Sequence, residues 1–191
     1  MNDLILMIAL LFSPFFNQSI QDLNNYPIKS GMIKYQFEGR VIGTEEIYFD
    51  DYGSSIYILK TVCHESTGRN VCDSVLKILC SDSMLVLNTS ERTAKRYPLK
   101  DTLINCINNI VSPEMLESMG YFKEGTEKVS GVLCNRYSGE NGTMWVWNNI
   151  ILKSQMVIMN IQMKMEAVEV YTGIDVPKSK FKLPSNYKLI N

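Results

Sequence analysis

Apolar and polar residues alternate one by one along several stretches of this chain, and this period of two constrains its fold more than any other feature. Ile33, Tyr35 and Phe37 alternate with polar or charged residues. From residue 157 to 167 the odd positions read Val, Met, Ile, Met, Met and Ala, and the even positions from 160 to 166 are polar. Because successive side chains of a strand point to opposite faces, both stretches predict strands with one buried face.

Turn signals divide the chain into many short strands. Asp50-Asp51-Tyr52-Gly53 and Glu140-Asn141-Gly142 predict turns, because Asp, Asn and Gly tolerate the backbone angles of tight turns. Besides the strand around Tyr35, we expect strands at 41–50, 55–63, 71–80, 84–88, 93–97, 129–137, 143–147, 150–153 and 156–171, and a last short one around Phe181.

Two short helices are predicted in the middle of the chain. Asp101 is a candidate N-cap for a helix in which Leu103, Ile104, Ile107, Ile110 and Val111 recur at helical spacing. Ser112-Pro113 is a second helix start, with Ser as the cap and Pro at the first helical position, and this helix stops at Gly120. The predicted class is therefore mainly β (α+β), with a meandering antiparallel sheet, curved or closed, and short helices that cover it.

The N-terminus predicts export. Leu4 to Phe12 is a short apolar run, too short for a bilayer span of about 20 residues but of the length of a signal-peptide core. No Lys or Arg precedes it, so an uncleaved anchor or a buried first helix are the alternatives. We expect residues 1–20 to be a signal peptide or N-terminal apolar segment, and residues 21–191 to form a single domain without a transmembrane span.

Five cysteines fit an oxidising compartment. Cys63 and Cys72 flank a stretch that looks like a hairpin loop, and a bridge between them would contribute about 2–3 kcal/mol. The alternative is a metal site of Cys63, His64 and Cys72, which lacks a paired Cys-x-x-Cys and a second His. Cys80, Cys106 and Cys134 remain, at least one of them without a partner in an odd-numbered set.

Charge and motifs argue against nucleic-acid binding and catalysis. The net charge is −1, so no basic excess is present to hold a phosphate backbone. His64 is the only histidine, no nucleophile-elbow or phosphate-loop motif is present, and the neighbouring Asp50 and Asp51 would point to opposite faces of a strand. We expect no enzymatic activity, no metal and no cofactor, with a hydrolase using His64 or Asp50–Asp51 as the weakest alternative.

The apolar side chains point instead to binding. The chain has 11 Met, and Met159, Met163 and Met165 share one face of the predicted strand at 156–171. Methionine adapts to irregular apolar partners because it is unbranched and polarisable. Trp145 and Trp147 share a strand face and could wall a pocket. Ordinary core packing is the alternative for each of these residues taken singly.

The chain also resembles an uncharacterised bacterial family of the LolA/LolB-like lipoprotein-carrier superfamily. The resemblance lies in KSGMIKYQFEGRVIGTEEIYFDDYG at 29–53, EKVSGVLCNRY at 127–137, GTMWVWNNIILKS at 142–154, Ala167, and VPKSKFKLPSNYKLI at 176–190. Residues 54 to 126 match poorly. The resemblance implies a curved antiparallel sheet forming an incomplete barrel, with short helices covering its concave, apolar face. The carriers' regulatory arginine and protruding delivery loop have no match in this sequence.

The resemblance implies a non-catalytic periplasmic or secreted protein of the cell envelope that binds or carries a lipid, an acyl chain or a lipoprotein. Its partner would be the lipid or acylated protein, with an envelope protein as a further partner. An interaction module with a filled core is the main alternative. The predicted cavity lining is Ile33, Tyr35, Phe37, Trp145, Trp147, Met159, Ile161, Met163 and Met165.

Overall fold

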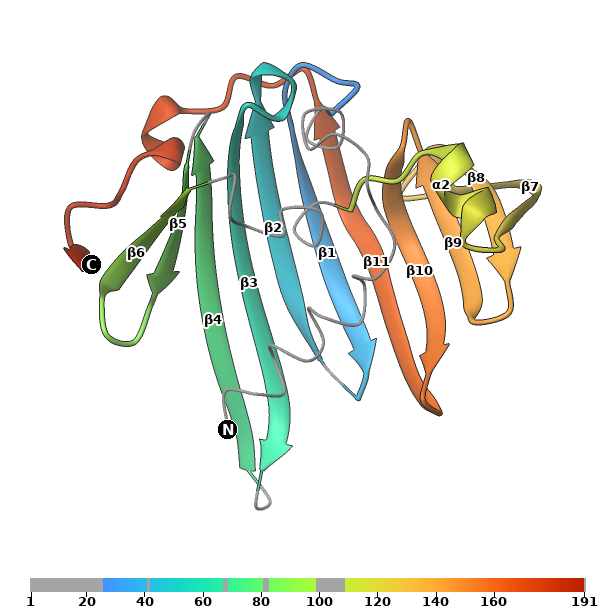
Figure 1. Cartoon of the computed structure of the whole chain (residues 1–191), viewed down its shortest axis with the longest axis horizontal. Helices are drawn as coiled ribbons and strands as arrows, with labels where there is room; N and C mark the ends of the chain where they lie inside the picture. The colour runs from blue at the N-terminus through green and yellow to red at the C-terminus, as the bar shows by residue number, and fades with distance from the viewer. Residues whose placement is uncertain (1–25, 41, 67–68, 81–82, 99–108, 191) are drawn as a thin grey trace.

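The computed structural model describes residues 26–40, 42–66, 69–80, 83–98 and 109–190 (Figure 1). They form one 12-stranded sheet in the order β12-β6-β5-β4-β3-β2-β1-β11-β10-β9-β8-β7. The strands are β1 (Gly31–Gly39), β2 (Ile42–Asp50), β3 (Ser55–Ser66), β4 (Arg69–Cys80), β5 (Ser83–Asn88), β6 (Thr93–Pro98), β7 (Phe122–Val129), β8 (Val132–Gly139), β9 (Gly142–Trp147), β10 (Ile150–Ile158), β11 (Ile161–Thr172) and β12 (Lys188–Ile190). The predicted signal segment, residues 1–20, lies outside the described residues.

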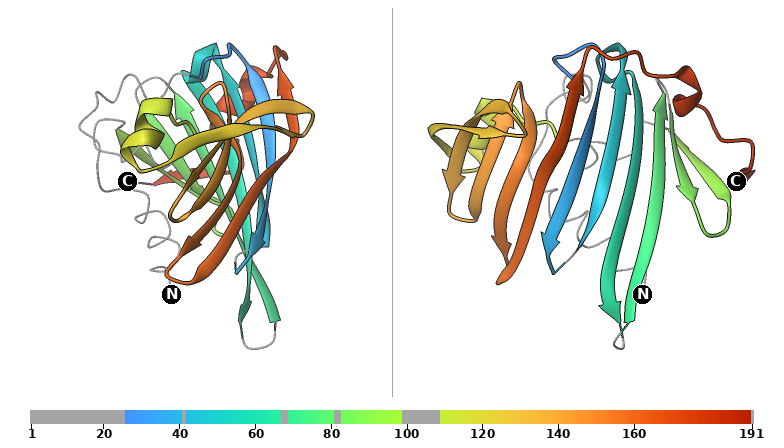
Figure 2. Two further views of the ribbon diagram at one scale, coloured as in Figure 1. Left: turned by 90° about the vertical axis from the view of Figure 1, so that its right-hand side faces the viewer. Right: turned by 180° about the vertical axis from the view of Figure 1, so that it is seen from behind.

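The sheet is open and curved (Figure 2). Neighbouring strands are antiparallel, except that β12 runs parallel to β6. β1 lies in the middle of the sheet between β2 and β11, which brings the start of the described chain against a strand more than 120 residues away. The prediction of a mainly β protein with a curved, antiparallel and unclosed sheet is therefore confirmed.

One predicted strand is the end of one strand and most of the next, and one strand was not predicted. The strand expected at 156–171 covers the end of β10 and most of β11, joined at Met159-Asn160. The strand expected at 129–137 is β8, which starts later, at Val132, whereas β7 and the turn Ser130-Gly131 before it were missed. All four turn residues have positive φ, between 47° and 80°. In a two-residue turn the flanking residues pair with each other, as Ile158 does with Ile161, so the odd positions change face at the turn. The apolar Met159 continued the odd-position pattern of the sequence, and the β10–β11 turn was therefore missed.

The C-terminal strand was also misplaced. Phe181, expected in a strand, ends the 3-10 helix η4 (Lys178–Phe181), and the strand follows later as β12. Phe181 is buried against the sheet. One turn of helix after Pro177 is enough to turn the Phe181 side chain toward the sheet, so its burial does not require a strand.

The predicted helix after Ser112 is present as α2 (Pro113–Ser118). The Ser112 Oγ accepts a hydrogen bond from the Met115 amide at 3.2 Å, and Pro113 is the first helical residue. Most of the helix predicted after Asp101 lies outside the described residues, but its last residues are not helical, because Ile110 forms a β-bridge with Ile150.

The turn predicted at Asp50–Gly53 is present as the 3-10 helix η1 (Asp51–Gly53).

Both faces of the sheet carry apolar residues. The inner face is defined by the cross-strand partners Ile33, Ile47 and Ile58, and the outer face by Tyr48, Tyr57 and Ile78. On the outer face the C-terminal segment packs through Val176 and Phe181, and η4 lies behind the sheet of Figure 1 (Figure 2). On the inner face α2 packs through Leu116 against side chains of β8, β9 and β10.

Candidate apolar binding face

The inner face brings together five of the predicted lining residues. Ile33 and Tyr35 are buried, and Phe37 follows them on β1 with its ring half-buried. β11 runs alongside, with Met165 opposite Phe37 and Met163 opposite Gly39. Because directly paired residues share a face, these side chains form a continuous apolar strip down the middle of the sheet.

The two tryptophans lie on the other face. Trp145 pairs with Lys153, Lys153 pairs with Glu166, and Glu166 pairs with Gln36 on β1. Gln36 is next to Tyr35 in the strand and therefore points to the opposite face, so Trp145 lies on the outer face. The Lys153 Nζ lies 3.2 Å from the Glu166 carboxylate and 5.0 Å from the centre of the Trp145 ring.

The outer-face tryptophans are nevertheless joined to the inner cluster through packing. The Trp145 indole N–H donates to Glu127 at 2.7 Å, and the ring is buried. Trp147 is opposite Ile150 on the same hairpin. Trp145, Leu152, Ala167 and Tyr35 belong to one hydrophobic cluster, and β10 is irregular in register next to Leu152.

The last two predicted lining residues lie at the far end of β11. Met159 is in the β10–β11 turn, with φ 51° and 75% of its surface exposed. Ile161 begins β11 opposite Ile158 and is half-buried. The turn geometry therefore separates Met159 from Met163, although both occupy odd positions of one alternating stretch. Ligand binding by the nine residues stays a prediction.

An ion pair between a buried carboxylate and a partly exposed ammonium lies on the inner face, and the sequence reasoning missed it. Glu45 is opposite Tyr35 and only 6% exposed. Its carboxylate lies 3.2 Å from the Lys60 Nζ and accepts a weak hydrogen bond from the Asn109 side chain at 3.4 Å. The Lys60 ammonium also lies 4.4 Å from the centre of the Phe37 ring. The signal was available, because Glu45 shares strand parity with the apolar Ile47 and Phe49.

Tyr35 is held beside this ion pair. Its hydroxyl donates to the Ile151 carbonyl at 3.0 Å, a contact that reaches from β1 to β10 across β11. Burial raises the pKa of Tyr35 well above its ordinary value, and the neighbouring Tyr26 and Glu45 raise it further. The side chain therefore stays a neutral donor throughout the physiological range.

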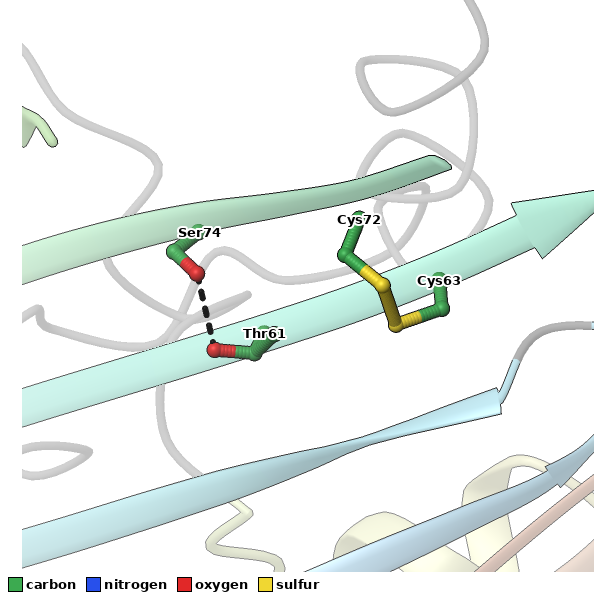
Figure 3. Close-up of a disulfide and its surroundings, with 4 residues drawn as sticks. All are labelled: Thr61, Cys63, Cys72 and Ser74. Atoms are coloured by element: carbon green, nitrogen blue, oxygen red, sulfur yellow. Dashed lines mark hydrogen bonds between the residues drawn. A yellow bond between two sulfur atoms is a disulfide. The ribbon is translucent and has the colours of Figure 1, made fainter. Parts of the chain in front are cut away.

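The predicted disulfide is confirmed. Cys63 and Cys72 are directly opposite each other on β3 and β4 and form a disulfide near the end of this long hairpin (Figure 3). Two cross-strand pairs further along, the Thr61 and Ser74 hydroxyls lie 2.9 Å apart. Because both sulfurs are used in the bridge, the alternative metal site with His64 is excluded. Cys106 lies outside the described residues.

The residues weighed for catalysis are placed in local structural roles. The Asp50 carboxylate accepts from the Asp51 amide at 2.8 Å and so caps η1, while Asp51 is exposed. His64 is half-buried on β3 opposite Val71. Within the described ranges, no group of three His, Cys, Asp or Glu side chains could hold a metal ion.

Two open grooves accompany these features, and both have polar walls. One, of about 340 Å³, lies on the outer side of β1, β11 and β10 between Gln36, Lys153 and Glu166. The other, of about 590 Å³, lies beside η1 and includes Asp51 and Asp175. Neither groove is a closed apolar cavity.

Comparisons with known proteins support the fold. No protein-family model matches the chain, and no curated protein matches it. An uncharacterised conserved protein from Thermus thermophilus has a similar structure, with a TM-score of 0.58 at 7% identity over 91% of this chain and 99% of that one. LprF from Mycobacterium bovis gives a TM-score of 0.38 at 6% identity over 82% of this chain and 94% of that one, a likeness too weak to support an inference. In the part of the chain that the structure describes, no helix has the length and apolar character needed to cross a bilayer.

Proposed function

We propose that this protein is a non-catalytic binding or carrier protein for a lipid, an acyl chain or an acylated protein in the cell envelope. The observation that carries the proposal is the composition of the hydrophobic cluster that contains Ile33, Tyr35 and Trp145. Its described members come almost entirely from the strands, and only Tyr26, Ile28 and Ile110 come from elsewhere. A sheet face of this kind offers an extended apolar surface to whatever lies on it.

An acyl chain suits such a surface. Each buried methylene contributes about 0.8 kcal/mol, so a chain laid along the strip of Phe37, Met163 and Met165 would gain affinity without precise shape matching. The two methionines can adjust to an irregular chain, because their side chains are unbranched. The Lys60 ammonium pairs with Glu45 and lies 4.4 Å from the centre of the Phe37 ring, and its side chain is 42% exposed, so it can also contact an anionic head group.

The envelope location rests on the disulfide. Cross-links such as Cys63–Cys72 persist in oxidising compartments and are rare in the cytosol. The apolar segment at residues 4–12 is a second feature that supports export.

The test compares two methionines that lie four residues apart. Met163→Asp places a carboxylate on the half-buried strip opposite Gly39, whereas Met159→Asp places it in an exposed turn. We expect Met163→Asp to weaken binding of a fluorescent fatty acid by tenfold or more, since burying a charge without a partner costs more than about 1.4 kcal/mol. Met159→Asp should bind like the unmodified protein, because the proposed site is the strip of Phe37, Met163 and Met165 and does not include this exposed turn residue. Equal binding by all three proteins would refute the proposal that this strip holds the ligand.

A second candidate is an envelope protein-interaction module whose interior is a filled core. It is favoured by the complete burial of Tyr35, Ile47, Phe49 and Ile56, each at 0% exposure. The same experiment separates the two functions. Absence of fatty-acid and phospholipid binding by the unmodified, folded protein would support the interaction module.

A further inference from the structure

Apolar side chains are exposed at one end of the sheet, on the tips of two neighbouring hairpins. Met159, in the turn between β10 and β11, and Val157 just before it are both exposed, and Ile42 at the start of β2 is 61% exposed. The two tips lie side by side, because β1 pairs with β11 and Gly39 is opposite Met163. We call Ile42, Val157 and Met159 the apolar rim, which lies at the lower end of β2, β10 and β11 in Figure 1.

Met159 occupies a position that neither turn geometry nor water favours. Three two-residue hairpin turns have positive φ at both turn positions, namely Ser130-Gly131, Asn148-Asn149 and Met159-Asn160. Gly, Asn and Asp adopt this conformation at the lowest cost, and the first two turns consist of small or polar residues. A long apolar side chain at φ 51° therefore lowers folding stability while it stays in water. Burial of the Met159 side chain in a complex would offset both costs.

The charges next to the rim suit an anionic lipid surface. Residues 39–44 and 155–164 contain no Asp or Glu, and their only charged residues are Arg40 and Lys164. Lys164 is opposite Glu38, so the exposed Arg40 is the cation that stands beside the rim without a directly opposite carboxylate. Apolar side chains flanked by a basic residue are typical of segments that enter the interface of a membrane with anionic lipids.

From these observations we infer that the apolar rim docks on a phospholipid bilayer and inserts its side chains into the bilayer interface. The rim consists of hairpin tips and is not part of either groove described above. A bilayer interface accepts protruding apolar side chains without a complementary shape, whereas a protein partner would need a pocket for each of them. At the opposite end of the same strands, the groove beside η1 includes Asp50, Asp51 and Asp175, which an anionic surface would repel.

The rim continues into the strip proposed to hold an acyl chain. Ile161, half-buried at the start of β11, lies between Met159 and Met163, and Met165 follows opposite Phe37. A lipid that leaves the bilayer at the rim would therefore reach the strip along apolar side chains. This link rests on the proposed function, whereas docking itself does not. Docking changes how fast lipid reaches the strip and not how tightly the strip holds it, so a changed rim leaves fatty-acid affinity unaltered.

Flotation with vesicles of phosphatidylethanolamine and phosphatidylglycerol tests the docking. We expect the protein to bind these vesicles, and Met159→Asp or Ile42→Asp to weaken the binding by about tenfold or more, because a carboxylate resists entry into an anionic interface. Asp tolerates the positive φ of residue 159, so the first variant stays folded. Met159→Leu keeps an apolar side chain and should bind like the unmodified protein. Leu133→Asp is the matched control and should also bind, since Leu133 is 59% exposed on β8, outside the rim.

Absence of vesicle binding by the unmodified protein would overturn the inference, and so would equal losses in Met159→Asp and Leu133→Asp. A dimer in sedimentation velocity that Met159→Asp dissociates would assign the rim to a second copy of the chain and would overturn it as well. The fatty-acid assay separates this inference from the proposed function. Vesicle binding without fatty-acid binding would support docking and refute carriage, whereas fatty-acid binding without vesicle binding would refute docking alone.

Discussion

Tyr35 provides a quantitative test of how the inner face is held together. Its ring is fully buried and its hydroxyl donates to the Ile151 carbonyl at 3.0 Å. Tyr35→Phe keeps the ring and removes the donor. A buried carbonyl that loses its partner costs about 1–2 kcal/mol, so we expect the free energy of unfolding to fall by that amount near neutral pH.

The difference between the two proteins should depend on pH in a definite direction. Burial raises the pKa of Tyr35, so the unfolded state loses the phenolic proton first, and the stability that this tyrosine contributes is lost as pH rises above about 10. For one such tyrosine the loss reaches about 1.4 kcal/mol by pH 11. Phenylalanine has no proton to lose, so Tyr35→Phe should become about as stable as the unmodified protein by about pH 11.

The assay is urea unfolding at a series of pH values, followed by the fluorescence of Trp145 and Trp147. Trp145 is buried, so its emission should respond to unfolding. A gap in stability that stays constant up to about pH 11 would refute the claim that Tyr35 is held neutral. Absence of any gap near neutral pH would refute the contribution of the hydrogen bond to Ile151.

Three further predictions concern local features. The double variant Cys63→Ser/Cys72→Ser should lower the free energy of unfolding by about 2–3 kcal/mol in urea titrations, and no change would show that the hairpin is not cross-linked. Ser112→Ala removes the cap of α2 and should cost about 1 kcal/mol in thermal unfolding, whereas Ser112→Thr should cost little. Met159→Gly should raise stability by about 0.5 kcal/mol, because φ is 51° at this turn residue. Lower stability of that variant would contradict the turn assignment.

The sequence was sufficient for features that depend on neighbouring residues. The alternation around Tyr35 predicted β1, and Ser112-Pro113 predicted the start of α2, because strand parity and helix capping are local. The disulfide was predicted for the same reason, since Cys63 and Cys72 lie within one hairpin.

Features that depend on the register between distant strands were missed. Which face of the sheet Trp145 lies on depends on how β9, β10, β11 and β1 pair, through Lys153 and Glu166. The sequence of one strand does not show how it pairs with the next. The parity of Glu45 indicated the inner face, but its partners, Lys60 on β3 and Asn109 before α2, lie on other segments of the chain and were not predicted.

The fold-level part of the family resemblance, an open curved antiparallel sheet, is confirmed by the structure. Lipid carriage is the central claim that goes beyond it. The most direct test is native mass spectrometry of the protein isolated from cells that produce it, with identification of the extracted small molecules. We predict a bound species with the mass of a lipid or acylated peptide, retained in Met159→Asp and lost in Met163→Asp. Only the bare polypeptide mass, with no uptake of added fatty acid or phospholipid, would contradict the claim.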